Sequence, residues 1–316
     1  MNWACEGRHM FSMKDQGANS PLQNVLDVLE SVILGKPEQI RLSLATVLAR
    51  GHLLVEDVPG VGKTTLVRAL ARVLGLETKR VQFTNDLLPA DILGTAIFDQ
   101  QKQVFQLHPG PIFTNALIAD ELNRGTPRTQ SAFLQAMEER RVALEGTSRD
   151  LPNPFFVVAT QNPREQVGTY ALPESQLDRF LMRIHMGFPL PQFEIELLKG
   201  NRQMVDTLQA LLDPGKVLEL QGQVDRITCA EPVLKFTQRI LAQSRSLKGD
   251  FPGLSPRSGL AILAAARAWA FLAGREFVLP EDVQAVGPWV VNHRMKYPTE
   301  SAFEKSREFV MSVPVE

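Results

Sequence analysis

The chain has 316 residues, with 34 Lys and Arg against 35 Asp and Glu. This balanced charge shows neither a nucleic-acid footprint nor a polybasic membrane patch. No apolar run approaches the roughly 18 residues that a membrane-spanning helix needs, so no membrane insertion is expected. The two cysteines, Cys5 and Cys229, lie far apart without metal-ligand spacing. Free thiols and a cytoplasmic protein are the simple expectation.

The first part of the chain predicts a lead and two helices. Residues 1–20 lack the apolar core of a signal peptide, and we expect a disordered or tag-like segment. Apolar residues at helical spacing follow over residues 22–33 and stop at Gly35. Pro37 suits the first position of a second helix, which is expected to run to about Gly51.

A glycine-rich turn between a strand and a helix follows, in the stretch LLVEDVPGVGKTTLVRALARVL of residues 53–74. The two glycines at 60 and 62 let backbone N–H groups turn toward phosphate oxygens, and the helix start favours the same anion. The pattern predicts a phosphate-binding loop. Its residues are Pro59, Gly60, Val61, Gly62, Lys63, Thr64 and Thr65.

The chemistry assigns separate roles within this loop. Lys63 is expected to reach the β- and γ-phosphates of a nucleotide, and the Thr64 hydroxyl to bind Mg²⁺. Asp57 departs from the motif, because it stands where the first glycine is usual. An ordinary glycine-rich strand-to-helix turn is the alternative interpretation.

The next stretch of the chain alternates strands with helices. Strands are predicted at residues 79–83, 117–119 and 155–160, and a helix at residues 128–140. This alternation predicts an α/β fold in which a parallel sheet lies between helices. Residues 93–107 and 141–150 interrupt the pattern and are expected to form hairpin insertions. Simple surface decoration is the alternative role for them.

Strand signals end near residue 190. Helices are then predicted at residues 233–247, 256–273 and 280–294. We therefore expect a nucleotide-binding core over residues 21–190 and an α-helical domain over residues 191–316.

Two polar groups follow predicted buried strands. In ALIADE, residues 116–121, Asp120 lies at the strand tip and is expected to hold Mg²⁺ beside Thr64, directly or through water. Glu121 is then free to orient and polarise the attacking water. Asn162 follows the next strand, where its amide could contact the γ-phosphate. As an alternative, Asn162 is a turn residue that precedes Pro163.

Two arginines have both a functional and a structural interpretation. Arg179 lies toward the end of a short helix predicted at residues 172–180. It is either an ion-pair partner of a nearby carboxylate or an arginine finger for another subunit's nucleotide. Arg257 lies in the first turn of a helix, where the dipole does not favour a cation. This position suggests that a phosphate compensates its charge.

The motifs, in order, resemble those of the AAA+ ATPases: GxGKT, IADE, ATQNP, LPESQLDRF and SPRSG. Within that class, EDVPGVGKTT, QFTNDLLPADILG, GPIF and ADELNRGTPRTQSAFLQAMEER are similar to the MoxR family. The resemblance runs from about residue 22 to residue 295. Asp57 matches what this family commonly carries.

The resemblance implies an AAA+ P-loop core with a C-terminal helical lid, assembled into a homo-oligomeric ring that is usually hexameric. It implies that Asn162 is sensor 1, Arg179 the arginine finger and Arg257 sensor 2, with ATP and Mg²⁺ as cofactors. It also implies hydrolysis that remodels, activates or assembles protein clients, often proteins with von Willebrand factor A domains.

The sequence has three alternative functional interpretations. A nucleic-acid motor is disfavoured by the balanced charge, and an ATPase subunit of a metal-chelatase-like complex is the nearest functional cousin. A non-hydrolysing binding module is disfavoured because Glu121, Asn162 and Arg179 are all present.

Overall fold

The computed structural model describes residues 21–58, 60–101, 103–144, 147–161, 168–200, 204–247, 253–297 and 301–315. The predicted lead (residues 1–20), Pro59 and Asn162 lie outside these ranges. In the part of the chain that the structure describes, no helix is long and apolar enough to cross a membrane.

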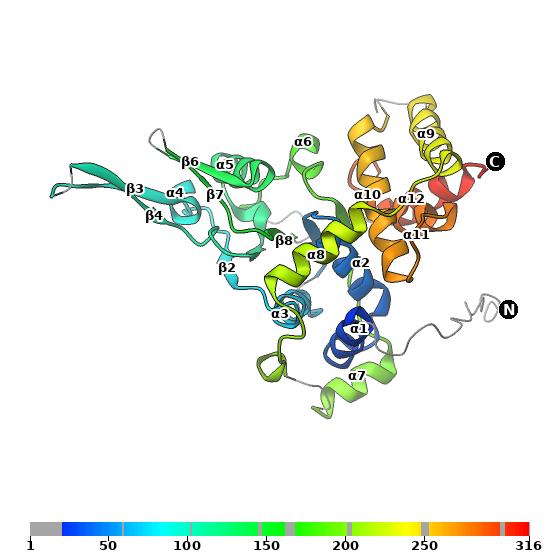
Figure 1. Ribbon diagram of the computed structural model, residues 1–316, viewed down its shortest axis with the longest axis horizontal. Helices are drawn as coiled ribbons and strands as arrows, with labels where there is room; N and C mark the ends of the chain where they lie inside the picture. The colour runs from blue at the N-terminus through cyan, green and yellow to red at the C-terminus, as the bar shows by residue number, and fades with distance from the viewer. Residues whose placement is uncertain are drawn as a thin grey trace.

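A five-stranded parallel sheet forms the centre of the core (Figure 1). Its strands, in spatial order, are β2 (Thr78–Gln82), β5 (Ala116–Asp120), β8 (Phe156–Gln161), β1 (Leu53–Glu56) and β9 (Met182–Ile184). The β1 strand, which leads into the glycine-rich turn, pairs with β8 on one side and β9 on the other. Because all five strands run parallel, their carboxyl ends meet at one edge.

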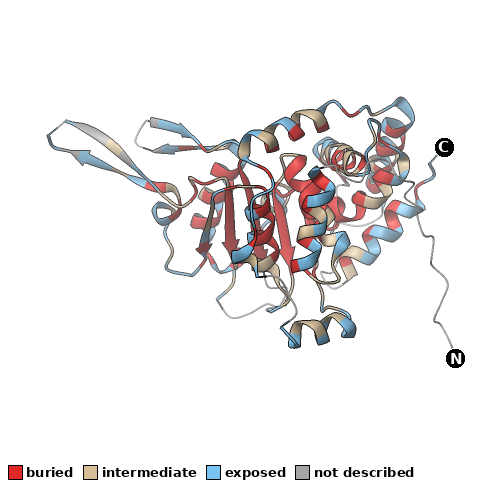
Figure 2. Cartoon of the chain, turned by 60° about the horizontal axis from the view of Figure 1, so that its bottom comes forward, coloured by how far each residue is buried: buried red, intermediate tan, exposed pale blue. Residues whose placement is uncertain are grey.

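Alternating side chains of these strands enter two different cores. Leu53 and Val55 of β1 join one hydrophobic cluster, and Leu54 joins the other. The first cluster is covered by helices α1 (Pro21–Val32), α2 (Pro37–Leu48) and α3 (Lys63–Val73). The second is covered by α5 (Pro127–Glu139), with α4 (Pro89–Leu93) packed on it. The sheet is therefore buried on both faces, as Figure 2 shows.

Two hairpins extend from the end of the core opposite the helical domain (Figures 1 and 2). Strands β3 (Gly94–Asp99) and β4 (Val104–Pro109) form one antiparallel pair. Strands β6 (Arg141–Leu144) and β7 (Thr147–Asp150) form the other. Neither pair joins the five-stranded sheet.

Beyond β9, the described residues form helices and the segments that connect them. The longer helices are α7 (Pro191–Leu198), α8 (Pro214–Asp225), α9 (Glu231–Ser246), α10 (Pro256–Leu272), α11 (Pro280–Val291) and α12 (Ala302–Ser312). Proline occupies the start of several, where its missing N–H costs nothing. The Ser255 hydroxyl also accepts a hydrogen bond from the Ser258 N–H at the start of α10.

The short helix predicted at residues 172–180 is wrong in extent. The structure has only α6 (Glu174–Leu177) there, because Pro173 fixes its start. The Phe180 N–H then bonds back to the Leu177 carbonyl, which closes a tight turn before β9.

The helical domain shares its core with the sheet. Val233, Ile262 and Val283 belong to the same hydrophobic cluster as Leu53 and Leu66. Helix α10 packs on α2 of the core, and α11 packs on the edge strand β9. The two parts are thus joined by continuous apolar packing.

His52 lies fully buried beside the start of β1. Its Nδ1 accepts a hydrogen bond of 3.0 Å from the Val157 N–H, so this nitrogen carries no proton. Burial, together with the nearby Arg140 guanidinium, lowers the pKa of His52 to about 3. The folded chain therefore holds His52 neutral.

This burial predicts a loss of stability in mild acid. Below a pKa of about 6.5 the unfolded chain binds a proton at His52 and the folded chain does not. The free energy of unfolding should therefore fall as the pH drops from 6.5 toward 3, by about 2 kcal/mol at pH 5. Urea unfolding of His52→Asn, which retains an acceptor for Val157, should lack this part of the decrease. Replacing the exposed His108 by Asn should leave the wild-type dependence, and an equal decrease in His52→Asn would contradict the assignment.

Candidate nucleotide site

The glycine-rich turn opens a side-chain-free space at the start of α3. Gly60 has a φ of +88° and Gly62 a φ of +91°, in the left-handed region that favours glycine. A Cβ built on either glycine would meet no atom within 4 Å. Helix α3 begins directly after, at Lys63, so its unpaired N–H groups and positive dipole end border this space. The arrangement is an anion site.

Lys63 lies among carboxylates at this space. Its Nζ donates to the main-chain oxygen of Asp57 at 2.5 Å. Burial lowers the pKa of Lys63, and the charges of Asp57, Asp120, Glu121 and Glu56 act in the opposite direction. These charges keep a cation where the phosphate group of a nucleotide would need one.

Asp57 has a structural reason to replace the motif's usual glycine. Its Oδ2 accepts from the N–H groups of Met186 at 2.7 Å and Gly187 at 2.6 Å. Its Oδ1 accepts from the Val58 N–H at 2.8 Å. The carboxylate therefore fastens the phosphate loop to the segment after β9.

Asp120 ends the buried strand β5 at the same edge of the sheet. Its side chain is 7% exposed, and its Oδ2 lies 2.5 Å from Arg80 Nε. The Thr160 hydroxyl, on β8, donates to Asp120 Oδ1 at 3.1 Å. The same hydroxyl accepts from the Glu121 N–H at 3.0 Å. Thr160 thus ties both acidic residues to the neighbouring strand.

Glu121 adopts a left-handed conformation, with a φ of +53°, which turns it out of the strand. Its Oε2 accepts from Gln82 Nε2 at 2.7 Å and from Arg124 at 3.1 Å. Both bonds use one oxygen, so Oε1 is the oxygen left for a water among the described contacts. Gln82, Arg124 and Arg80 were not identified as site residues from the sequence. The predicted strand at residues 79–83 was the available signal, because its carboxyl end lies at this edge of the sheet.

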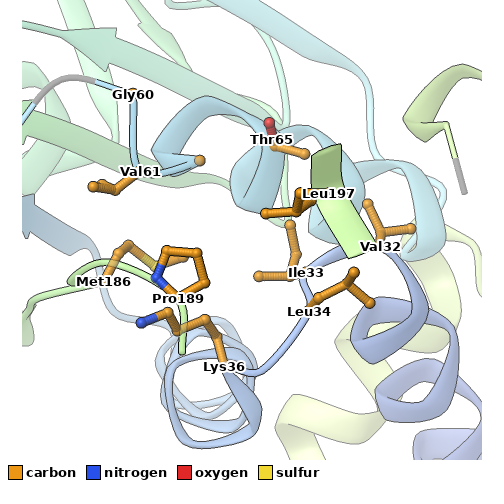
Figure 3. A pocket seen from close by; sticks show the side chains of 11 residues that line it. Val32, Ile33, Leu34, Lys36, Gly60, Val61, Thr65, Met186, Pro189 and Leu197 are labelled. Carbon is orange, nitrogen blue, oxygen red and sulfur yellow. The ribbon is translucent and has the colours of Figure 1, made fainter. Parts of the chain in front are cut away.

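A mostly apolar pocket adjoins the phosphate loop (Figure 3). It lies between the α1–α2 connection, the loop and the segment that Asp57 holds. Its lining consists of Val32, Ile33, Leu34, Lys36, Gly60, Val61, Gly62, Thr65, Met186, Pro189 and Leu197. Three separate stretches of sequence meet here, so no local pattern could have indicated it. The size and the mostly apolar lining of this pocket suit a flat aromatic group such as a nucleobase.

The two candidate arginines meet elsewhere, on one carboxylate. Glu138 of α5 pairs with Arg179 Nε at 3.2 Å and with Arg257 at 2.6 Å. Asp178 lies 3.5 Å from Arg257 Nε and 2.6 Å from the buried Arg294. Within the described residues, Arg179 NH1 is buried without a hydrogen-bond partner.

The predicted site residues therefore form two groups. Lys63, Asp120 and Glu121 lie together at the phosphate loop. Arg179 and Arg257 lie together around Glu138. In this structure Glu138 and Asp178 lie beside Arg257. The expectation that a phosphate compensates the charge of Arg257 stays a prediction. Pro59 and Asn162 lie outside the described residues.

This fold and site define an AAA-type ATPase. Residues 52–182 match the family model described as ATPase family associated with various cellular activities (AAA). Residues 252–312 match the AAA lid domain. The predicted α/β core with a C-terminal helical lid is thereby confirmed.

Similar proteins narrow the class. The chain is 42% identical to YeaC of Bacillus subtilis, over 90% of this chain and 89% of that protein. It is 38% identical to Chaperone MoxR1 of Mycobacterium tuberculosis, over 87% of this chain and 75% of that protein. The crystal structure of a candidate ATPase from Cytophaga hutchinsonii superposes with a TM-score of 0.81 at 35% identity, covering 93% of this chain and 94% of that one. The chain belongs to the MoxR family of AAA+ ATPases, as its motifs predicted.

The Asp57 clamp makes a prediction for stability. Asp57→Ala leaves three N–H groups without their charged acceptor and should lower the free energy of unfolding by about 2 kcal/mol. Asp57→Gly, which restores the usual motif residue, should lose the same bonds. Denaturant unfolding measures both.

Asp225→Ala is the matched control, because its carboxylate forms only an exposed ion pair with Arg50 at 3.1 Å. Such pairs are worth about 0–1 kcal/mol. If Asp57→Ala unfolds with no larger loss than Asp225→Ala, the clamp does not hold the segment.

Proposed function

We propose that this ATPase hydrolyses ATP with Mg²⁺ in a homo-oligomeric, hexameric ring that remodels, activates or assembles partner proteins. The observation that carries the proposal is the division of the site into two groups. The phosphate loop has the binding cation and the acidic pair, and the arginines that would act on a transferred phosphoryl group gather around Glu138 instead.

The residues at the loop fit a magnesium nucleotide. The Asp120 carboxylate and the Thr64 hydroxyl would hold Mg²⁺, which takes few protein ligands and completes its shell with water and phosphate oxygens. In keeping with this, the described residues contain no group of three or more His, Cys, Asp or Glu side chains that would hold a metal alone. Bound there, Mg²⁺ would neutralise charge on the β- and γ-phosphates.

Glu121 is the proposed base of the reaction. Gln82 and Arg124 fix its Oε2, and its Oε1 would orient the attacking water. Lys63 would bind the β- and γ-phosphates, and the apolar pocket in Figure 3 would take the adenine. Asn162, directly after β8, is the proposed sensor of the γ-phosphate.

The arginine pair supports a site completed by a second copy. Arg179 would act as the arginine finger of the neighbouring subunit, where it stabilises charge that develops on the phosphoryl group. Arg257, the proposed sensor 2, is held beside it by the shared Glu138 and would approach the same nucleotide. A head-to-tail contact of this kind closes into a ring.

Protein clients are the proposed substrate of the ring. The relative from Mycobacterium tuberculosis is named a chaperone. The β3–β4 hairpin extends from the body and exposes apolar side chains, with Ile97 51% exposed. We propose that the hairpins contact clients, proteins with von Willebrand factor A domains among them, in the cytoplasm. Nucleic acid is not the proposed partner.

Nucleotide binding is tested by Lys63→Ala. Saturating ATP should raise the melting temperature of the wild type, because a ligand that binds only the folded state stabilises it. The variant should fold and lose this shift, since Lys63 serves the ligand. Lys216→Ala, which removes a partly exposed lysine of α8, should keep this shift. An equal shift in Lys63→Ala and wild type would refute the site.

The subunit boundary is tested by mixing two inactive variants. Glu121→Gln keeps the arginine finger and loses the base, and Arg179→Ala keeps an intact pocket and loses the finger. Loss of a finger costs about 10³ to 10⁵ in rate. Mixed assemblies place good fingers against good pockets, so ATPase activity should reappear. Subunit exchange is first established by co-purifying differently tagged chains, after which no recovery at any ratio would exclude action in trans.

A further inference from the structure

A buried ion pair that the chemistry does not use links β1 to the edge strand β9. Glu56 Oε2 lies 2.9 Å from Arg183 NH1, and the side chains are only 4% and 6% exposed. Glu56 is the last residue of β1, directly before the phosphate loop. Arg183 is the middle residue of the three in β9.

On the core side, Glu56 reaches two further strand ends. Its Oε1 accepts from Gln161 Nε2 at 2.9 Å. Gln161 is the last residue of β8, so it directly precedes the proposed sensor position. The Glu56 main-chain oxygen also lies 2.6 Å from His185 Nδ1. The Glu56 carboxylate is therefore hydrogen-bonded to the end of β8, the strand whose end would respond to the γ-phosphate.

On the lid side, the other nitrogens of Arg183 bond to Asn292, just after α11. NH2 donates to the Asn292 main-chain oxygen at 2.7 Å and Nε donates to its Oδ1 at 3.3 Å. Asn292 Nδ2 donates back to the Arg183 main-chain oxygen at 3.0 Å. His293 lies beside both segments, with its Nδ1 3.1 Å from Asn292 Oδ1 and its Nε2 3.0 Å from the Phe180 main-chain oxygen.

A buried ion pair is a poor device for stability, because desolvation of both charges offsets their attraction. Its geometry is nevertheless strict, since the planar guanidinium fork bonds in fixed directions. If Arg183 moved with Glu56 alone, the polar groups of Asn292 would lose their partner. If it moved with Asn292 alone, Glu56 would be left unpaired in the interior. A movement of the β1 and β8 ends must then be shared by the end of α11.

We propose that Arg183 is a positioning residue that couples the nucleotide state at the phosphate loop to the end of lid helix α11. The proposal rests on the proposed function, because it takes the β8 end to respond to the γ-phosphate. Arg183 touches no reacting group. It acts through Glu56 and Gln161 on one side and through Asn292 on the other.

Hydrogen exchange of the backbone amides at residues 289–295 tests the coupling. In the wild type, exchange with adenylyl imidodiphosphate bound should differ from exchange with ADP bound by about 5- to 150-fold, the usual range of coupling between two sites. Arg183→Met should reduce that ratio to about one. Both nucleotides should still bind, because Arg183 is not one of the residues proposed to bind the nucleotide. Arg183→Lys keeps the charge beside Glu56 but lacks the fork, so it should restore stability and not the ratio.

Two further variants separate a loss of coupling from a loss of stability. If Arg183→Met fails to fold because Glu56 is left unpaired, Glu56→Leu/Arg183→Met removes both charges and should fold with the ratio lost. Arg275→Met breaks another ion pair, with Asp282 at 2.5 Å, which lies wholly within the lid and has its arginine side chain 25% exposed. It should be destabilised and keep the wild-type ratio.

The outcomes are distinguishable. A wild-type ratio in Arg183→Met, or in the double variant, overturns the coupling role. A wild type that hydrolyses ATP yet shows no difference between the two nucleotides overturns it as well. A wild type that binds neither nucleotide would instead overturn the proposed function.

Discussion

Parallel pairing of β1, β8 and β5 is the constraint on which the site depends. The register sets Glu56 beside Gln161, and Ala119, the residue before Asp120, beside Ala159. The carboxyl ends of all three strands therefore meet at one edge, where the phosphate loop begins. The acidic pair, the loop lysine and the Thr160 hydroxyl come together without any long insertion to carry them.

The sequence could predict what is periodic or local. Strand alternation, the helix that starts at Lys63 and the acidic pair at the end of β5 each have a short-range signal. It could not predict that Arg179 and Arg257 share Glu138, because that contact joins α5, the turn before β9 and the lid. The apolar pocket could not be predicted either, because its lining also comes from segments that lie far apart in the sequence. The sequence signal for the Glu56–Arg183 pair was a lone arginine in the apolar stretch LMRI, residues 181–184.

In the proposed reaction, the two groups of charged residues act from different surfaces. Around Lys63, carboxylates outnumber the cation and make a place for a metal nucleotide. Around Glu138, arginines are held by carboxylates that are only partly buried, with Glu138 35% and Asp178 25% exposed. Such pairs exchange partners at modest cost, and a phosphate from a second copy is a stronger acceptor.

The hydrophobic cluster that runs unbroken from the sheet into the lid limits how the molecule can move. Swinging the lid away as a hinged flap would open that apolar interior to water, at a cost that grows with every exposed side chain. Short sliding displacements of α10 over α2 and of α11 over β9 keep the packing closed. In the proposed ring, large displacements would then come from whole subunits turning against each other, and the hairpins at the far end of each core would travel furthest.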